Sequence, residues 1–287
     1  MFRIPNSSIL KYFPGHMAKG LRIIKNKVSS VDCIIEIRDA RIPFSSHSSK
    51  LAQFTSKKPY VLILNKSDLI STKDMKNIEK RLKNNGLDNY IFTSCIDNHK
   101  KVVENIIDKT HKLGLVVGMP NVGKSTFINK LRQIKLKRKG RATPVGMFAG
   151  VTRRVMDRIK VCDNPSFYML DTPGILSPSI DSIEAGMRIA LCGTMQDHLV
   201  GNEIICEYLV YWMNKNKISN FTKYYQLDSI DGDIYEILKN IAIARNLFSQ
   251  HKTVTKKIVS IPDYNLISNK IIRDFRSGNL GKICLDL

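Results

Sequence analysis

The stretch Gly118-Met-Pro-Asn-Val-Gly-Lys-Ser125 decides the fold of this chain, because it satisfies the pattern G-x-x-x-x-G-K-[ST] at every position. An apolar run, Leu115–Val117, leads into it, and a helical pattern leads out from Lys124. Such a loop wraps backbone N–H groups around a phosphate. We expect Lys124 to reach the β- and γ-phosphates and Ser125 to bind Mg²⁺. The residues predicted to contact the nucleotide here are Pro120, Asn121, Val122, Gly123, Lys124, Ser125 and Thr126.

A second motif identifies the base. Asn65-Lys-Ser-Asp68 follows the apolar run Val61–Leu64, which is typical of a buried strand. The carboxylate of Asp68 can accept hydrogen bonds from N1–H and from the exocyclic amine of guanine, whereas adenine offers no such pair. The backbone N–H groups of Ser94 and Cys95, which end the next predicted strand, are expected to contact guanine O6. The sequence thus predicts guanine recognition by Asn65, Lys66, Ser67, Asp68, Ser94 and Cys95.

A third motif, Asp171-Thr-Pro-Gly174, follows another apolar run and has the form of a metal-side motif. Asp171 is expected to hold the Mg²⁺ shell, and the Gly174 amide is expected to sense the γ-phosphate. Thr152 lies between this motif and the phosphate loop, in a glycine-led loop that can close over the nucleotide. The predicted Mg²⁺ ligands are therefore Ser125, Thr152 and Asp171.

The order of these motifs indicates a circular permutation. In ordinary GTPases the phosphate loop comes first and the base-reading motif last, whereas here Asp68 precedes Gly118. Cutting one surface connection and joining the old termini leaves the strand neighbours unchanged, so the same site can assemble. The chain then passes directly from Gly174 into its C-terminal part, which is therefore placed to receive movement driven by the γ-phosphate.

Short apolar runs alternate with longer helical patterns, which is typical of a mostly parallel sheet with helices on both faces. The predicted strands are Cys33–Ile37, Tyr60–Leu64, Tyr90–Thr93, Leu115–Val117, Val155–Val161 and Phe167–Leu170. The predicted helices among them are Met17–Ser30, Thr72–Asn84, Lys100–Leu113 and Lys124–Lys130. From Asp181 the pattern predicts only helices: Asp181–His198, Asn202–Met213, Asp233–Phe248 and Tyr264–Phe275. We expect an α/β GTP-binding domain over residues 1–177 and a helical domain over residues 178–287.

The charge balance favours a polyanionic partner. The 287 residues include 46 Lys and Arg against 25 Asp and Glu, a formal net charge of +21. Such a chain is expected to associate with nucleic acid or with an anionic membrane surface. Six cysteines show no metal-like spacing, and no apolar stretch approaches the roughly 18 residues of a membrane span. A cluster of cations lies between the phosphate loop and Thr152: Lys135, Lys137, Arg138, Lys139 and Arg141.

With this order of motifs the chain resembles the circularly permuted ribosome-assembly GTPases, most closely the mitochondrial ribosome-associated GTPase 1 group and its bacterial large-subunit assembly relatives. Further matching segments are Phe13–Lys19, Asp32–Pro43, Ala190–Gly193, Asp197–Val200 and Phe275–Gly281. The resemblance implies hydrolysis of GTP to GDP in assembly of the large subunit of the mitochondrial ribosome, in contact with its rRNA, and thereby a role in mitochondrial translation. It also implies a monomer on the matrix side of the inner membrane, with peripheral membrane association.

The resemblance bears on catalysis as well. Ile175 follows Gly174 where many signalling GTPases place a water-orienting Gln, so intrinsic hydrolysis is expected to be slow and to be stimulated by the ribosome. The histidine of the Pro-Gly-His-Met motif, here His16, is a proposed catalytic contributor in relatives and joins Lys124 and Thr152 as a candidate. A capping or packing role for His16 stays open.

Potassium is a further candidate cofactor beside GTP, GDP and Mg²⁺, because Asn121 matches the position where potassium-activated relatives bind K⁺. The loop Pro144–Gly150 departs from the polar or proline-containing segment common in relatives.

Two functions compete with GTP hydrolysis on ribosomal RNA. Because Ile175 cannot orient water, the sequence is also compatible with a GTP-regulated RNA-binding or membrane-tethered scaffold with negligible turnover. A P-loop kinase is disfavoured, because such an enzyme does not need the Asn65–Asp68 motif. Release of phosphate on adding large subunits would distinguish the GTPase from the scaffold.

Overall fold

The computed structural model describes residues 15–47, 53, 58–94, 112–137, 158–174, 182–252 and 258–287. Its packing divides the chain into two units. The first unit runs to Gln196 and includes Lys282–Leu287, and the second is Asp197–Gly281. The division therefore lies after Gln196 rather than between residues 177 and 178, and the last six residues of the sequence belong to the first unit.

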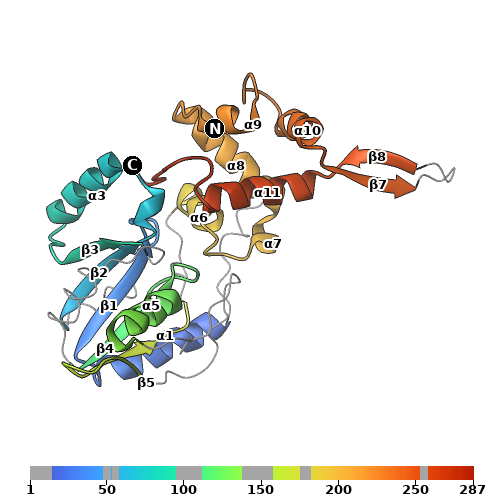
Figure 1. The fold of residues 1–287 in the computed structure, drawn as a ribbon. Helices are drawn as coiled ribbons and strands as arrows, with labels where there is room; N and C mark the ends of the chain where they lie inside the picture. The colour runs from blue at the N-terminus through green and yellow to red at the C-terminus, as the bar shows by residue number, and fades with distance from the viewer. Residues whose placement is uncertain are drawn as a thin grey trace. The chain divides into compact units, whose positions relative to one another are not determined.

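The first unit is built on a six-stranded sheet with the order β3-β2-β1-β4-β6-β5 (Figure 1). Its strands are β1 (Cys33–Asp39), β2 (Tyr60–Asn65), β3 (Tyr90–Thr93), β4 (Leu113–Val117), β5 (Arg158–Cys162) and β6 (Phe167–Asp171). Every neighbouring pair is parallel except β5 with β6. All residues of β1 and β4 are buried, as their continuous apolar runs predict. The mostly parallel sheet is thus confirmed.

The helices of this unit agree with the sequence pattern in most places. They are α1 (Gly15–Val28), the short 3₁₀ helix η2 (Ser67–Leu69), α3 (Thr72–Asn84), α5 (Lys124–Leu136) and α6 (Ile183–Leu191). A capping box begins α3, where the Ser71 hydroxyl accepts from the Asp74 N–H at 3.0 Å. Most of the predicted helix Lys100–Leu113 lies outside the described residues, but its end is wrong, because Leu113 begins β4. The predicted strand Val155–Val161 is described from Arg158 on, as β5, and residues 155–157 lie outside the described ranges.

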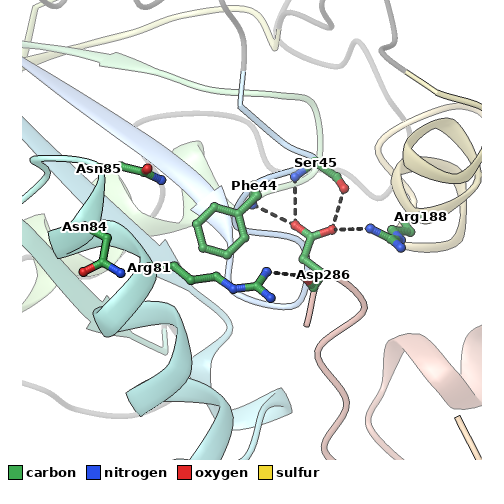
Figure 2. Close-up of a pocket in the computed structure, with 7 residues that line it drawn as sticks. All are labelled: Phe44, Ser45, Arg81, Asn84, Asn85, Arg188 and Asp286. Atoms are coloured by element: carbon green, nitrogen blue, oxygen red, sulfur yellow. Dashed lines mark hydrogen bonds and ion pairs between the residues drawn. The ribbon is translucent and has the colours of Figure 1, made fainter.

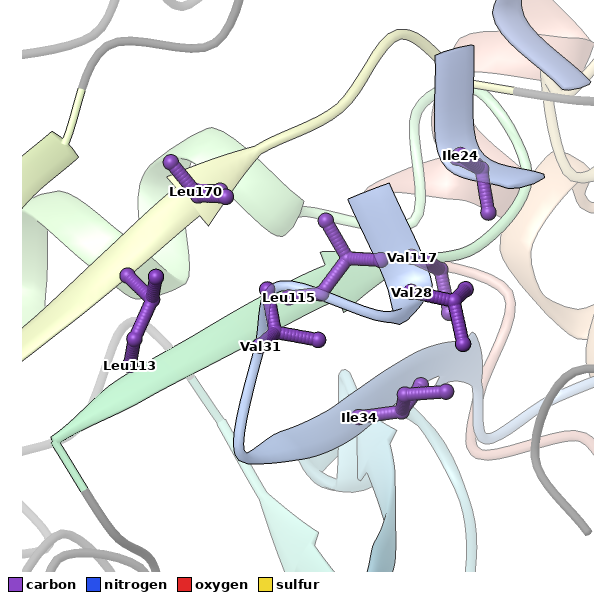
Figure 3. Close-up of a cluster of buried hydrophobic side chains, with 8 residues drawn as sticks. All are labelled: Ile24, Val28, Val31, Ile34, Leu113, Leu115, Val117 and Leu170. Carbon is purple, nitrogen blue, oxygen red and sulfur yellow. The ribbon is translucent and has the colours of Figure 1, made fainter. Parts of the chain in front are cut away.

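Two hydrophobic clusters cover one face of the sheet. Ile24 and Val28 of α1 pack on the centre of the sheet (Figure 3). The buried members of this first cluster are Ile24, Val28, Val31, Ile34, Leu113, Leu115, Val117 and Leu170. Ile78 and Leu82 of α3 pack on β2 in the second cluster, and Tyr60 contacts both clusters. Because Ile34 is paired with Tyr60 in the parallel register, α1 and α3 lie on the same face.

The second unit contains α7 (Asp197–Val200), α8 (Asn202–Lys215), α9 (Asn220–Tyr225), α10 (Ile234–Arg245) and α11 (Tyr264–Arg276). The prediction of helices alone is wrong here, because β7 (Phe248–Lys252) and β8 (Ile258–Pro262) form an antiparallel hairpin (Figure 1). The helix predicted to end at Phe248 stops earlier, since Asn246 adopts the left-handed conformation with φ 52°. The predicted helix Asp181–His198 is also broken, with Gly193 at φ 76° between α6 and α7. No helix within the described ranges combines the length and apolar character that a membrane crossing requires.

Candidate functional site

The predicted motifs that the structure describes lie at the carboxyl edge of the sheet. Asn65 ends β2, Asp39 ends β1, Asp171 ends β6, and the phosphate loop follows β4. These strands are parallel, so their carboxyl ends meet at one edge. The strand order reverses between β1 and β4, because β2 and β3 lie on one side of this pair and β6 and β5 lie on the other. Open α/β sheets bind ligands at such a reversal of strand order.

The phosphate loop requires glycine at two positions. Gly118 and Gly123 have φ values of 145° and 98°, which L side chains rarely adopt. A Cβ on Gly118 would lie 2.2 Å from the Ile37 carbonyl oxygen, and one on Gly123 would lie 2.3 Å from the Asn65 amide nitrogen. The loop therefore packs directly against β1 and against the base-reading motif. Helix α5 begins at Lys124 and directs its N-terminus at this loop.

Lys124 is held inside the phosphate loop. Its side chain is buried, and Nζ donates to the Met119 carbonyl oxygen at 2.7 Å. Burial lowers the pKa of the Lys124 ammonium to about 8, although the nearby Asp171 carboxylate partly opposes this shift. A buried cation of this kind is stabilised by an anion, and a phosphate group bound in the loop would supply one. The position fits the predicted contact with the β- and γ-phosphates.

Ser125 and Asp171 come together on the metal side. The Ser125 hydroxyl donates to Asp171 Oδ2 at 2.6 Å, and Asp171 Oδ1 is buried without a hydrogen-bond partner among the described residues. Burial raises the pKa of the Asp171 carboxyl. A buried carboxylate beside a hydroxyl is a donor set suited to Mg²⁺, whose charge would favour the ionised form. The residues present therefore fit the predicted ion.

Gly174 closes on the phosphate loop. A Cβ at this position would lie 2.5 Å from Pro120 Cα, so only glycine permits the approach. The preceding strand end is fixed by Thr172, whose hydroxyl donates to the Val116 carbonyl oxygen at 2.7 Å. The Gly174 backbone is thus next to the loop expected to hold the phosphates, as sensing of the γ-phosphate requires.

Asn65 and Asp68, the first and last residues of the base-reading motif, differ in their hydrogen bonding. The Asn65 amide donates to the Val122 carbonyl oxygen at 2.7 Å, so this side chain joins the motif to the phosphate loop. Asp68 Oδ1 is buried and lacks a hydrogen-bond partner within the part of the chain described. An unpaired buried carboxylate oxygen is costly and fits a ligand that donates hydrogen bonds, as the guanine edge does. The geometry thus fits the prediction that Asp68 contacts the base, whereas the Asn65 amide bonds to the phosphate loop.

The sequence motifs gave no role to Asp39 and Arg41, yet these residues support the base-reading loop. Asp39 accepts from Arg41 Nη2 at 2.8 Å and from Lys66 Nζ at 2.7 Å. Burial would raise the pKa of Asp39, but the Arg41 guanidinium and the Lys66 ammonium outweigh it and hold the pKa well below its usual range. The sequence feature that could have indicated this role is Asp39-Ala-Arg-Ile-Pro43, in which an acidic and a basic residue lie where a buried strand ends.

Asn121 joins the phosphate loop to the segment after α6. Its backbone has φ 58°, and its amide nitrogen donates to the Gly193 carbonyl oxygen at 2.6 Å. This contact was not predicted. A K⁺ ion at this position would use the carbonyl oxygen of the same amide, so the donor bond and the predicted ion involve different atoms of Asn121.

The remaining predicted residues are only partly described. Ser94 is buried directly after β3, and Thr126 lies in the first turn of α5. His16 lies in α1, but its side chain is outside the described part of the chain. Cys95, Thr152 and Ile175 also lie outside the described residues.

The chain is similar to known GTPases over nearly its whole length. A family model described as "50S ribosome-binding GTPase" matches residues 114–246. The mitochondrial ribosome-associated GTPase 1 of Mus musculus is 40% identical over 302 residues, which cover 99% of this chain and 92% of the relative. The Xenopus tropicalis protein of the same name is 40% identical, with 99% and 97% covered. Mitochondrial GTPase 1 of Schizosaccharomyces pombe is 30% identical, with 96% and 89% covered.

Solved structures agree on the fold. The crystal structure of GNP-bound YlqF from T. maritima has a TM-score of 0.63 and covers 93% of this chain and 97% of its own, at 23% sequence identity. The GDP-bound structure of the same protein has a TM-score of 0.61. At this identity the likeness concerns the fold alone, and it supports the sheet and loop arrangement described above. Because its relatives match over nearly their full length, the chain is a GTPase and belongs to the mitochondrial ribosome-associated GTPase 1 family.

Proposed function

We propose that the protein acts in assembly of the large subunit of the mitochondrial ribosome, and thereby in mitochondrial translation, as a GTPase that the subunit stimulates. The observation that carries this proposal is likeness over 99% of the chain to proteins named for ribosome association. We place the protein on the matrix side of the inner membrane, peripherally attached and monomeric. GTP, GDP and Mg²⁺ are its ligands, and K⁺ is a further candidate.

The proposed nucleotide chemistry rests on the residues around the phosphate loop and on the base-reading motif. Lys124 and the loop amides would bind the phosphates, Ser125 and Asp171 would hold Mg²⁺, and Thr152 is a further candidate ligand from the sequence. Asp68 reads guanine, because one of its oxygens is buried and unpaired among the described residues. Bound Mg²⁺ would neutralise charge that develops on the phosphates during transfer to water.

The RNA partner rests on charge. The net charge of +21 is large for 287 residues, and a basic surface releases counterions when it binds RNA phosphates. In the second unit Lys270 and Arg273 are exposed on α11. Arg276, in contrast, is paired with Asp197 through two 2.7 Å contacts, so it is not counted as an RNA contact. Of the basic loop cluster, Lys135 and Lys137 are described and the other three cations are not.

Sedimentation with purified mitochondrial large subunits tests the partner. We expect more protein in the subunit fractions with a non-hydrolysable GTP analogue than with GDP, because the γ-phosphate orders the loops around Gly174. By linkage, bound subunits must then raise affinity for the GTP analogue relative to GDP. Phosphate release measured in parallel should rise on adding subunits. The proposal would be contradicted if sedimentation with subunits did not depend on the nucleotide and phosphate release did not rise on adding subunits.

A five-site variant tests the electrostatic contribution. Replacing all members of the basic loop cluster by alanine should weaken binding to subunits and flatten its dependence on salt, by up to about one logarithmic unit of slope for each RNA phosphate that is no longer neutralised. Affinity for GTP should stay near normal. The matched control replaces five exposed lysines of α3 and α10, which should change binding much less. The five residues replaced in the test variant, as opposed to the control, are Lys135, Lys137, Arg138, Lys139 and Arg141.

A further inference from the structure

The segment Lys282–Leu287 returns to the nucleotide-binding unit and lies beside the base-reading loop. Cys284 belongs to the hydrophobic cluster that includes Leu64 and Ile70, the residues that flank the base-reading motif. Leu285 is also buried, at 1% exposure. The segment is therefore part of the packed structure around this loop.

Asp286 anchors the segment through its carboxylate. It accepts from the backbone N–H groups of Phe44 and Ser45 at 2.7 and 2.8 Å, and from Arg188 Nη1 at 3.2 Å (Figure 2). The two backbone N–H groups bond to Oδ2, whereas the Ser45 hydroxyl and Arg188 both donate to Oδ1. The Asp286 backbone carbonyl accepts from Arg81 Nη1 at 3.0 Å. Hydrogen bonds to a charged acceptor are the strong kind, so this residue fixes the segment firmly.

Two backbone hydrogen bonds connect this anchored segment to Leu69, in the base-reading loop, and to Arg41, which follows β1. The Ile283 N–H donates to the Leu69 carbonyl oxygen at 2.9 Å, and Leu69 follows Asp68 directly. The Leu285 N–H donates to the Arg41 carbonyl oxygen at 2.8 Å. Arg41 in turn pairs with Asp39, the same carboxylate that holds Lys66. The segment therefore contacts the loop directly at Leu69, and indirectly, through Arg41 and Asp39, at Lys66.

The base-reading loop has little local means of fixing Asp68. It consists of a left-handed residue, Lys66 with φ 63°, followed by a 3₁₀ helix of only three residues, Ser67–Leu69. That helix has no side-chain cap at its start. Such a short helix has poor hydrogen-bond geometry of its own, so the position of the carboxylate depends on the residues packed around it.

We infer that Lys282–Leu287, anchored by Asp286, positions the base-reading loop and so sets the discrimination for guanine. The inference rests on the proposed reading of guanine by Asp68. Asp286 is a positioning residue, since it acts on the base through the loop. When the anchor is lost, Leu69 and Arg41 lose their tether, and the Asp68 carboxylate no longer meets both donors of the guanine edge at the correct distance.

The test compares GDP with IDP, whose base keeps N1–H but lacks the exocyclic amine. Dissociation constants are measured for the full chain carrying Asp286→Ala, with Asp88→Ala as the control, because Asp88 is an exposed acid on the same unit. We expect Asp286→Ala to weaken GDP binding about tenfold and IDP binding much less, so that the preference for GDP falls. Asp88→Ala should leave both constants unchanged.

A merely stabilising role for Asp286 predicts a different result. It lowers the melting temperature and the fraction of active protein, but it leaves the ratio of the GDP and IDP constants unchanged, and that outcome overturns the inference. Should Asp286→Ala fail to fold, Asp286→Asn keeps one acceptor oxygen and is measured in its place, with a smaller loss of preference expected. Asp68→Asn separates the two hypotheses. If that variant keeps the GDP preference, the base assignment itself is wrong; if only Asp286→Ala keeps it, the positioning inference alone fails.

Discussion

The phosphate end and the guanine end of the site are held in different ways. At the phosphate end, Lys124 bonds to Met119 five residues earlier in the chain, and the glycines of the same loop shape its backbone. At the guanine end, the short loop around Asp68 is held by Asp39 and by the segment Lys282–Leu287, which is distant in the sequence. The phosphate end is organised mainly by its own motif, with long-range bonds at Val122 and Asn121, whereas the guanine end depends mainly on long-range contacts.

The difference has consequences for how each end responds to change. A locally built loop keeps its shape when distant parts of the chain move, because its conformation is set by backbone dihedral angles. A loop held from a distance follows the elements that hold it. Since Asn65 bonds to Val122, the two ends are nevertheless joined directly by one buried hydrogen bond. Substitutions that affect one end and spare the other therefore test this comparison.

The largest effect is expected for Lys124→Ala at the phosphate end. The ammonium would be missing from the transition state of phosphoryl transfer, so GTP hydrolysis should fall on the order of a hundredfold or more. The measurement is single-turnover phosphate release at saturating GTP. The preference for guanine over hypoxanthine should persist, because the base end is intact. Lys76→Ala, an exposed lysine of α3, serves as the control, and equal turnover in both variants would remove Lys124 from the mechanism.

At the guanine end the corresponding change is Asp68→Asn. The amide loses one acceptor and gains a donor that matches the O2 acceptor of xanthine, so GTP affinity should fall roughly tenfold or more while XTP affinity rises. Turnover of bound nucleotide should change little, since the phosphate end is untouched. Equilibrium binding of both nucleotides measures the switch. A variant with normal GTP affinity would show that another group reads the base.

The same comparison explains what the sequence could predict. The phosphate loop, the strands around it and the parallel sheet were predictable, because glycine spacing and continuous apolar runs are local signals. The contacts of Asp286 and of Asn121 were not, since each joins residues far apart in the chain and no short pattern marks them. The hairpin β7–β8 was missed because its two short strands follow a long helical pattern without a break that the sequence makes obvious. Long-range pairing is a tertiary property.

A smaller effect is expected for Ser125→Ala, which probes the metal rather than the phosphates. Removing the hydroxyl leaves Asp171 as the predicted Mg²⁺ ligand among the described residues, so the Mg²⁺ concentration for half-maximal hydrolysis should rise about tenfold, as removal of one supporting group commonly costs. Turnover at high Mg²⁺ should recover toward the parent value. Ser166→Ala, in an exposed turn before β6, is the matched control. An unchanged Mg²⁺ requirement would exclude Ser125 as a ligand.

The smallest effect concerns Asn121, which lies in the phosphate loop but bonds outside it. A K⁺ ion held by its amide oxygen would place a positive charge near the transferring phosphate, where other GTPases use an arginine. Hydrolysis should therefore be at least about twofold faster in KCl than in NaCl at equal ionic strength, a small part of what an arginine finger supplies. Asn121→Ala should abolish that difference. Because this variant also loses the bond to Gly193, its GDP affinity is measured alongside and should fall little if the loop is organised locally. Equal rates of the parent protein in the two salts would retire the potassium site, whereas a large loss of GDP affinity in Asn121→Ala would show that the phosphate end, too, depends on a distant segment.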